Sequence, residues 1–431
     1  MSTCTTSLIT RLDLCAAFSP GISLAEERDP GHARRVTYLA WQLAVRAGMS
    51  EMQQAQLFCA ALLHDLGIIP VARQLASLPI NHDADLLRRH ADPGEGPTAE
   101  RRPRTPATAL LAAHPIQGAQ MALQAGLPHS VARLIALHHE RWDGGGNPNQ
   151  RAGRDLPLAA LLLAAADGLE GRLTAVRPPR PGYAAADFAR EMTAAIGPEA
   201  SALLAEAAAD PSFWEPVFAG WTGAAAERPA TAELTAPIGS WSEATPWGRF
   251  VDSKSAYGGS HSSRVAQLAA DMAVGIGLSA DHVDRIGWAG LLHDVGRLAI
   301  PCRISDRPGS LSAEEMEMVR RHPRVSREMV SALPDAVDIA RWAATHHERL
   351  DGSGYPYGLS GSELPVETRL LAIADVYDAL ISDRPFRPRF SEAEAGAELA
   401  RNSQQFDPVL LRALQQVRPV PEERAAEAIR G

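Results

Sequence analysis

The segment Leu-Leu-His-Asp-Leu-Gly at residues 62–67 returns as Leu-Leu-His-Asp-Val-Gly at residues 291–296. Such an internal repeat indicates a duplicated unit, which determines the domain organisation of the whole chain. Four further signals flank both copies: a His-x-x-Arg-Val run, a His-Pro pair, a His-His-Glu-Arg run and an Ala-Asp pair. Their histidines and aspartates are His32, His64, Asp65, His114, His138, His139 and Asp167 in the first copy, and His261, His293, Asp294, His322, His346, His347 and Asp375 in the second.

The spacing between these signals is the same in both copies at three intervals. The first histidine precedes the His-Asp pair by 32 residues, the His-Pro pair precedes the His-His pair by 24, and the second histidine of that pair precedes the aspartate by 28. The interval from the His-Asp pair to the His-Pro pair differs, at 50 residues against 29, and the extra residues fall in a polar, Arg/Pro-rich stretch around 81–106. We predict a tandem duplication with a surface loop inserted in the first copy.

Helical periodicity surrounds these residues, and no stretch alternates convincingly enough for a strand. Apolar residues recur at helical spacing after the first histidine of each copy, at Val36, Leu39, Ala40 and Leu43 and at Val265, Leu268, Ala269, Met272 and Ile276. Capping boxes that start helices are predicted at Ser50 with Gln53 and at Ser312 with Glu315. Pro115 and Pro323 are expected to end or restart a helix directly after a histidine. The predicted fold class is all-α, with two helical bundles related by duplication.

A length of 431 residues suggests two or three domains. The repeat narrows this to a first domain at 1–219, a linker at 220–250, where Ala, Gly, Pro, Ser and Trp follow no clean period, and a second domain at 251–431. No apolar run reaches the roughly 18 residues of a membrane helix. The N-terminus does not resemble a signal peptide because Arg11 and Asp13 interrupt its short apolar stretch. We therefore expect a cytoplasmic protein that contacts no membrane.

The net charge of −9 argues against bulk nucleic acid as a partner, although a local cationic pocket for a small phosphorylated ligand is compatible with it. The basic residues are almost all arginine, and Lys254 is the only lysine. The four cysteines stand far apart, which fits free thiols better than disulfides or a zinc knuckle.

The repeated histidines and aspartates suggest metal binding. A single histidine on a helix is usually a core or surface residue, but five histidines and two aspartates at fixed spacing in each copy are a different pattern. Imidazole and carboxylate suit Fe, Mn or Zn in mixed N/O sites. Seven side chains exceed what one tetrahedral ion needs and suit two ions that share a bridging carboxylate. Because two-metal sites stabilise in-line displacement at phosphorus, the pattern predicts phosphoester hydrolysis.

The second copy resembles the HD-GYP phosphodiesterases, a subgroup of the HD phosphohydrolase superfamily. The resemblance covers about residues 258–408 and rests on HSSRVAQLA, LLHDVGRLAIP, HHERLDGSGYPYGLSG, ELPVETRLLAIADVYDAL and SDRPFRPRFS. It implies a bacterial signalling enzyme that hydrolyses cyclic di-GMP to pGpG or GMP, or that linearises 3′3′-cyclic GMP-AMP. It also implies an HD-type helical bundle and two divalent ions, Fe or Mn. The metal ligands that match the family are His261, His293, Asp294, His322, His346, His347 and Asp375.

The resemblance also implies a set of catalytic and substrate-binding residues. Asp294, Asp378 and Arg297 occupy catalytic positions, with Arg297 in place of the lysine of HDxGK. Arginine binds phosphate well but does not readily donate a proton. Some members bind a third ion through a glutamate four residues before the first histidine; that position is Tyr257, which favours two ions. The substrate-binding positions implied are Arg297, Tyr355, Arg384 and Arg387.

The first copy resembles the family less well. It keeps a candidate second metal site at His32, His64, Asp65, His114, His138, His139 and Asp167, but HDxGK ends in Ile68 and GYP becomes Gly146-Asn147-Pro148. The SDRPFR segment has no clear counterpart. We expect a domain that is regulatory or a packing partner, rather than a hydrolase of another phosphoester.

Three functions stay open at this stage. The leading one is a cyclic di-GMP phosphodiesterase whose active site lies in the second copy. The second is a phosphodiesterase that prefers 3′3′-cyclic GMP-AMP. The third is a non-catalytic sensor or scaffold that binds a cyclic dinucleotide, a signalling protein or a second copy of the chain; Arg297 is the main feature in its favour.

Overall fold

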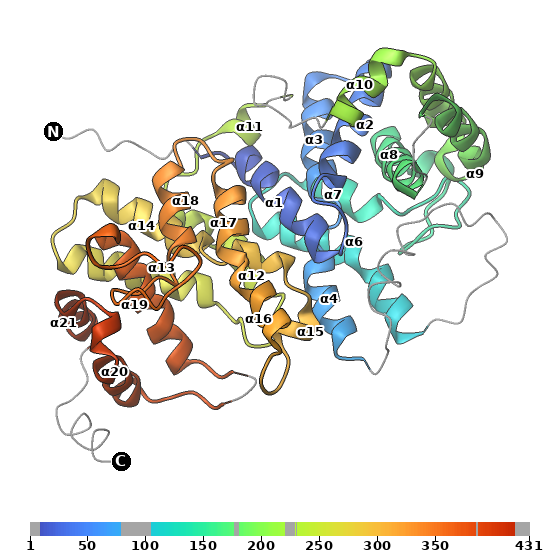
Figure 1. Ribbon diagram of the computed structural model, residues 1–431. Helices are drawn as coiled ribbons and strands as arrows, with labels where there is room; N and C mark the ends of the chain where they lie inside the picture. Colours follow the sequence, from blue (N-terminus) through green and yellow to red (C-terminus); the bar gives the residue numbers. More distant parts are fainter. Residues whose placement is uncertain are drawn as a thin grey trace. The chain divides into compact units, whose positions relative to one another are not determined.

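The computed structural model describes residues 9–78, 105–175, 181–219, 229, 231–384 and 387–418 (Figure 1). In these ranges the chain forms helices joined by turns and loops, and no β-strand is present; an isolated backbone bridge joins Arg384 and Arg387. The predicted all-α fold class is confirmed. The inserted stretch predicted around 81–106 lies almost entirely outside the described residues.

The chain divides into two compact units. One consists of Thr10–Ala236, and the other of Pro237–Gly431 together with Met1–Ile9. Part of the expected linker at 220–250 therefore belongs to the second unit. Residues 241–252 form two short helices there, and the side chains of Trp247 and Phe250 are buried. Burial of these large apolar side chains stabilises the segment in the core. The segment is too short for its helical periodicity to be recognised in the sequence.

The N-terminal unit is a bundle centred on α2, which packs against α3 and α8, while α6 packs against α7. The apolar face predicted at Val36, Leu39, Ala40 and Leu43 is fully buried on α2. Gly197 has a φ of 83° and kinks α9 into two segments. The helices are α1 (Arg11–Ala25), α2 (His32–Arg46), α3 (Glu51–Leu62), α4 (Ile68–Ala76), α6 (Pro106–Gln124), α7 (His129–Leu137), η1 (Gly153–Asp155), α8 (Leu158–Ala175), α9 (Pro181–Ala208), α10 (Pro211–Ala219) and α11 (Ala232–Thr235).

The C-terminal unit repeats this plan around α13, which packs against α12, α14, α19 and α21. Its predicted face is buried from Val265 to Met272, and Ile276 lies just beyond the end of the helix. The helices are η3 (Trp241–Ala244), α12 (Thr245–Asp252), α13 (His261–Gly275), α14 (Ala280–Leu292), η4 (Val295–Ala299), α15 (Cys302–Ser305), α16 (Ala313–Arg320), α17 (His322–Val330), α18 (Val337–Ala344), η5 (Gly361–Glu363), α19 (Val366–Ile381), α20 (Glu392–Arg401), η6 (Ser403–Gln405) and α21 (Pro408–Val417).

The predicted helix starts are confirmed, and the prolines behave differently in the two copies. Ser50 and Ser312 each form a complete capping box. Pro323 stands in the first turn of α17, as expected. The prediction for Pro115 is wrong, because α6 continues through it. A proline inside a helix removes one backbone donor, and here the ring of His114 donates to the carbonyl of Leu111, which that donor would have served.

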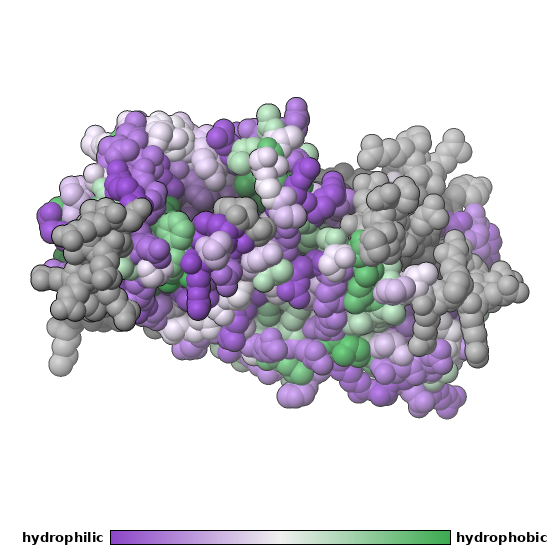
Figure 2. Space-filling model, turned by 90° about the horizontal axis from the view of Figure 1, so that it is seen from below, coloured by the Kyte–Doolittle hydropathy of each residue, from purple (hydrophilic) through white to green (hydrophobic). Residues whose placement is uncertain are grey.

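The structure also shows the surroundings of the cysteines and the composition of the helices. The cysteines described are buried, and the Sγ atoms of Cys15 and Cys59 lie 3.2 Å apart in the N-terminal unit. Among the described residues, no helix combines the length and the apolar composition needed to cross a bilayer. In the view of Figure 2, hydrophobic side chains are scattered between hydrophilic ones.

Candidate metal centres

The seven predicted ligands of the C-terminal unit converge from five separate helices. His261 begins α13, His293 and Asp294 follow α14, and His322 begins α17. His346 and His347 follow α18, and Asp375 lies in the middle of α19. All of them are buried except His347, whose side chain is 20% exposed. The fold therefore brings together the histidines and aspartates that the repeated spacing identified as candidate ligands.

The carboxylate of Asp294 lies between two groups of ligands. Its Oδ1 is 3.1 Å from Nε2 of His322 and 3.8 Å from Nε2 of His346. Its Oδ2 is 3.5 Å from Nε2 of His293 and 3.7 Å from Nε2 of His261.

Each group has a further ligand. Oδ1 of Asp375 lies 3.3 Å from Nε2 of His261. The donor atoms of His322, His346 and His347 lie within 4.8 Å of one another, as do those of His261, His293 and Asp375. One carboxylate facing two ligand groups is the arrangement that two bridged ions require.

Helix ends orient the imidazoles. The Nδ1 atoms of His293 and His346 donate to the carbonyls of Gly290 and Ala343, 2.7 and 2.6 Å away. These carbonyls belong to the last helical turn, whose acceptors have no partner further along the helix. A carbonyl only accepts hydrogen bonds, so Nδ1 carries the proton and Nε2 presents its lone pair to the cluster.

The His-Pro pair gives its histidine the same orientation. Nδ1 of His322 donates to the carbonyl of Val319, 2.6 Å away, and Pro323 cannot donate to that carbonyl because it lacks an N–H. His114 and Pro115 use the carbonyl of Leu111 in the same way. The motif thus combines a ligand with the group that fixes its tautomer, a role that the sequence analysis missed although the repeated His-Pro dipeptide carried the signal.

Several potential metal-binding atoms of the cluster are buried and have no hydrogen-bond partner among the described residues. They are Oδ1 of Asp294 and Nε2 of His261, His293, His322 and His346. Unsatisfied buried polar atoms are costly, so a convergent group of them indicates a missing partner. Lone pairs from imidazole and carboxylate point to a cation, and the residues present fit the divalent ions that the sequence predicts.

The electrostatics keep His346 and Asp294 in the form that binds a metal. Burial and the neighbouring His293 lower the pKa of His346 to about 3, which leaves its ring neutral. Burial alone would raise the pKa of Asp294, but Arg297 and His293 hold it well below the ordinary value. The bridging carboxylate is therefore ionised.

Asp378 orients His261. Its Oδ2 accepts from Nδ1 of His261 at 2.7 Å, and its Oδ1 accepts from Nε of Arg264 at 2.6 Å. Burial would lower the pKa of His261, but Asp375 and Asp378 raise it to about 9. The resemblance implied a catalytic position for Asp378; in the structure it lies behind the candidate ligand His261, where it aims Nε2 at the cluster.

Two of the predicted cationic residues lie beside the cluster. Arg297 and Arg384 line a small cavity of about 30 Å³ together with His261 and Asp294. Nη1 of Arg297 lies 3.0 Å from Oδ2 of Asp294, and its side chain is 31% exposed. Burial and the charge of Arg297 lower the pKa of Arg384. These two arginines supply the local positive charge that the acidic chain as a whole lacks.

Arg387 and Tyr355 are engaged in other contacts. The guanidinium of Arg387 donates to the carbonyls of Ala379 and Leu380 at the end of α19 and lies over the ring of Phe390. The structure therefore does not bring Arg387 into the cluster, and a substrate contact by it stays a prediction. Tyr355 stacks on His347 with ring centroids 4.6 Å apart, so it forms a wall beside a metal ligand.

A buried glutamate holds the loop that carries Tyr355. Oε1 and Oε2 of Glu348 accept from the backbone N–H groups of Tyr357 and Leu359, at 2.7 and 3.0 Å. In the first copy Glu140 accepts from Asn149 and Arg151 in the same pattern. The sequence analysis missed this role, although the glutamate of both His-His-Glu-Arg runs was visible.

The glycine of each His-Asp-x-Gly run permits a close helix contact. A Cβ on Gly296 would lie 2.1 Å from the carbonyl oxygen of His322, and one on Gly67 would lie 2.0 Å from that of His114. Only glycine lets the backbone after the His-Asp pair approach the helix that bears the next histidine. This packing brings the ligands of the His-Asp and His-Pro pairs into one cluster.

The N-terminal unit gathers its seven candidate ligands in the same way. Oδ1 of Asp65 lies 3.3 Å from Nε2 of His114 and 3.6 Å from Nε2 of His138. Its Oδ2 lies 2.8 Å from Nε2 of His64 and 3.7 Å from Nε2 of His32. The remaining candidates, His139 and Asp167, belong one to each group. Glu170 takes the place of Asp378, because its Oε2 lies 2.6 Å from Nδ1 of His32.

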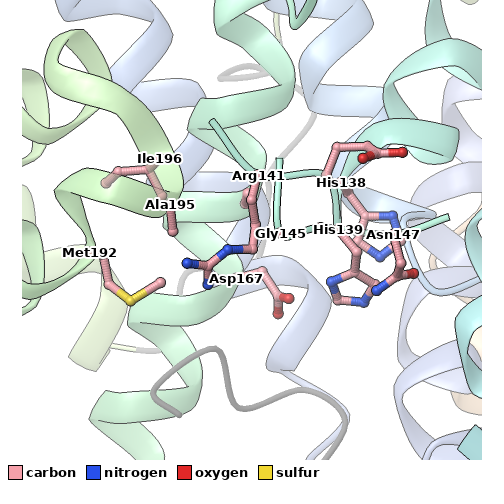
Figure 3. Close-up of a pocket in the computed structure, with 12 residues that line it drawn as sticks. His138, His139, Arg141, Gly145, Asn147, Asp167, Met192, Ala195 and Ile196 are labelled. Carbon is pink, nitrogen blue, oxygen red and sulfur yellow. The ribbon is translucent and has the colours of Figure 1, made fainter. Parts of the chain in front are cut away.

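The surroundings of the N-terminal cluster differ from those of the C-terminal one. A cavity of about 150 Å³ lies beside it, with the imidazoles of His138 and His139 on one side and Met192 and Ile196 of α9 on the other (Figure 3). Arg141 also lines the cavity, but its guanidinium pairs with Asp143.

Two family models match the chain, and both describe an HD domain. One covers residues 31–172 and the other residues 249–410. Each match contains one complete set of seven candidate ligands, so the models coincide with the two clusters.

Similar proteins of known activity are cyclic dinucleotide phosphodiesterases. The chain is 27% identical to the 3′3′-cGAMP-specific phosphodiesterase 3 of Vibrio cholerae serotype O1, across 90% of both chains. It is 42% identical to the cyclic di-GMP phosphodiesterase response regulator RpfG of Xanthomonas campestris pv. campestris, across 35% of this chain and 41% of that protein.

A solved structure supports the fold along nearly the whole chain. The crystal structure of a cyclic GMP-AMP-specific phosphodiesterase of V. cholerae superposes with a TM-score of 0.65. The superposition covers 97% of this chain and 99% of that one, at 22% sequence identity. At this identity the likeness establishes the tandem helical fold.

Proposed function

The chain belongs to the HD domain family and carries two such domains in tandem, and from this premise we propose that it is a metal-dependent phosphodiesterase acting on a cyclic dinucleotide. The active site is the C-terminal cluster. One observation carries the proposal: Arg297 and Arg384 line a cavity beside Asp294, whose two oxygens face two separate groups of imidazoles.

The ligands would hold two divalent ions, Fe or Mn, in two groups. His261, His293 and Asp375 form one, and His322, His346 and His347 form the other, with Asp294 shared. When bound, such a pair of ions lowers the pKa of water and neutralises charge that develops on a phosphoryl group.

The protein side chains around the ligands perform the remaining tasks. Arg297 and Arg384 attract and orient the phosphodiester, because arginine presents a fork of donors that matches phosphate oxygens. Asp378 keeps the ring of His261 in position. Tyr355 shapes the wall next to His347 and offers an aromatic face to a base.

Two cyclic dinucleotides are the candidate substrates. The sequence analysis placed cyclic di-GMP first. A relative that matches 90% of this chain is named for 3′3′-cGAMP, whereas RpfG, named for cyclic di-GMP, matches about a third of it. We therefore place 3′3′-cGAMP first and keep cyclic di-GMP as the alternative.

A hydrolysis assay tests the proposal. The full-length chain is loaded with Mn²⁺ or Fe²⁺ and incubated separately with 3′3′-cGAMP and cyclic di-GMP, and the products are separated by chromatography. We expect a linear dinucleotide from at least one substrate, and the ratio of the two rates identifies the preferred one. His346→Ala should abolish the reaction, whereas His138→Ala, its counterpart in the first copy, should retain it. A folded, metal-loaded chain that opens neither ring would support the sensor or scaffold alternative instead.

A further inference from the structure

The N-terminal cluster contains an arginine–glutamate pair that the C-terminal cluster lacks. Arg28 lies four residues before His32, and the corresponding position before His261 is Tyr257. Glu26 lies six residues before His32, and its counterpart is Ser255. The first copy therefore has an arginine and a buried carboxyl group at the edge of its cluster. Burial and the neighbouring Asp65 raise the pKa of Glu26 to about 8.

The guanidinium of Arg28 lies among the ligands of one group. Its Nη1 is 3.1 and 3.2 Å from the two ring nitrogens of His32 and 4.0 Å from Oδ1 of Asp167. In the C-terminal unit, Nε2 of His261 and Oδ1 of Asp375 face each other at 3.3 Å, and Tyr257 is exposed. Arg28 thus brings a positive charge to the part of the cluster where an ion would bind.

Glu26 anchors this cation from the buried side. Its Oε1 lies 3.2 Å from Nε of Arg28, and Oε2 of Glu170 lies 3.8 Å from Nη1. The side chains of Arg28 and Glu26 are 12% and 5% exposed. Withdrawal of Arg28 would leave the buried carboxyl group of Glu26 without this polar partner, which is costly. Arg297 of the C-terminal cluster lies 3.0 Å from Oδ2 of Asp294, but its side chain is 31% exposed against 12% for Arg28.

The other group of the N-terminal cluster has the same ligand types as its C-terminal counterpart, and Nε2 of His114 lies 3.2 Å from Nε2 of His138. The group consists of Asp65, His114, His138 and His139. Their potential metal-binding atoms lie within 4.8 Å of one another. Arg28 contacts the opposite group, at His32 and Asp167, and the carboxyl groups of Glu26 and Glu170. A guanidinium stays protonated at any accessible pH, so its charge repels a divalent ion beside it permanently.

We propose that the N-terminal unit binds a single divalent cation, through Asp65, His114, His138 and His139, and that Arg28 takes the place of the second ion. The chain then holds three ions, two in the C-terminal unit and one in the N-terminal unit. The N-terminal ion lies beside the 150 Å³ cavity. Without its partner ion this centre lacks the paired charge that in-line displacement at phosphorus uses.

Metal analysis of the full-length chain tests this inference without reference to hydrolysis. His293→Ala/Asp294→Ala empties the C-terminal cluster, so the N-terminal ions are counted alone. After saturation with Mn²⁺ and gel filtration, we expect one Mn per chain by inductively coupled plasma mass spectrometry. Adding His138→Ala should lower the count to zero. Two ions or none in the first variant would overturn the proposal.

Variants of this pair test the role of Arg28. On the same background, Arg28→Gln should raise the count from one to two, and Arg28→Lys, which retains the charge, should leave it at one. Glu26→Gln/Arg28→Gln replaces both side chains together and serves if the single variant unfolds, as checked by circular dichroism. A count that stays at one after Arg28 is neutralised in a folded chain would contradict the proposal.

Discussion

In the C-terminal unit, Arg297 and Arg384 line a cavity beside the bridging carboxylate, whereas in the N-terminal unit Ile68 follows the His-Asp-x-Gly run and is buried at the start of α4. Both units nevertheless keep seven candidate ligands, six of them buried, in a similar arrangement. The ligands are part of each core, and removing one would leave its neighbours as unsatisfied buried groups. Residues that contact substrate carry no such constraint. A complete ligand set is therefore weaker evidence for catalysis than the cations beside it.

The strongest test of this comparison replaces the central carboxylate in each unit. Asp294→Ala should lower hydrolysis by about a thousandfold, because the loss of several kcal/mol of charge stabilisation corresponds to that factor. Asp65→Ala should change kcat/KM for the cyclic dinucleotide by about twofold at most. Equal losses from the two substitutions would show that both clusters catalyse and would break the comparison.

Replacing the carboxylates that orient the first histidine should have a smaller effect. Asp378→Asn weakens the hold on His261, and we expect hydrolysis and metal affinity to fall by about 10- to 100-fold. Glu170→Gln, the matched variant, should leave hydrolysis unchanged. Excess Mn²⁺ should restore most of the activity of Asp378→Asn. A loss that no metal concentration restores would instead support the catalytic role predicted for Asp378 from the sequence.

The glutamates that hold the two loops offer a third comparison. Glu348→Gln leaves a buried backbone N–H without its acceptor, which should lower the stability of the loop by about 1–3 kcal/mol. Because this loop carries Tyr355 against His347, kcat/KM should fall by about tenfold. Glu140→Gln should destabilise the N-terminal unit by a similar amount in thermal unfolding, with hydrolysis intact. Unchanged turnover by Glu348→Gln would separate the loop from the reaction.

The smallest expected effect concerns the capping boxes. Ser50→Ala should cost about 1 kcal/mol of stability, because the cap starts α3, whose side chains are largely buried. Ser312→Ala should affect unfolding of the unit less, because α16 buries none of its residues, although local hydrogen exchange in α16 should increase. Neither variant should alter hydrolysis. Equal shifts in unfolding would mean that α16 is as tightly coupled to its core as α3.

The sequence predicted the ligand set and the fold class because duplication repeats every residue that the structure needs. The histidine and aspartate spacings located both clusters, and the apolar periodicity located α2 and α13. It did not reveal that Asp294 rather than Asp375 stands between the two groups, because sequence spacing does not fix the distances between helices. Arg28 escaped notice for a related reason: its position relative to His32 and Glu26 emerges only when α1 and α2 are packed.

Other features of the site depend on contacts between residues that the sequence pattern does not reveal. The orientation of His322 requires that Pro323 leave the carbonyl of Val319 without a backbone donor. Arg384 and Arg387 are equivalent as a basic pair in the sequence, yet one lines the cavity and the other binds carbonyls of α19. The helix η3 and the helix α12 were expected to be linker because their buried tryptophans follow no helical period.

Anomalous scattering from crystals of the Mn²⁺-loaded chain tests the central claim most directly. The account predicts two Mn peaks in the C-terminal unit, about 3.5–4 Å apart, one on each side of the carboxylate of Asp294. A single peak there, in protein that hydrolyses a cyclic dinucleotide, would contradict the two-ion centre on which the proposed function rests.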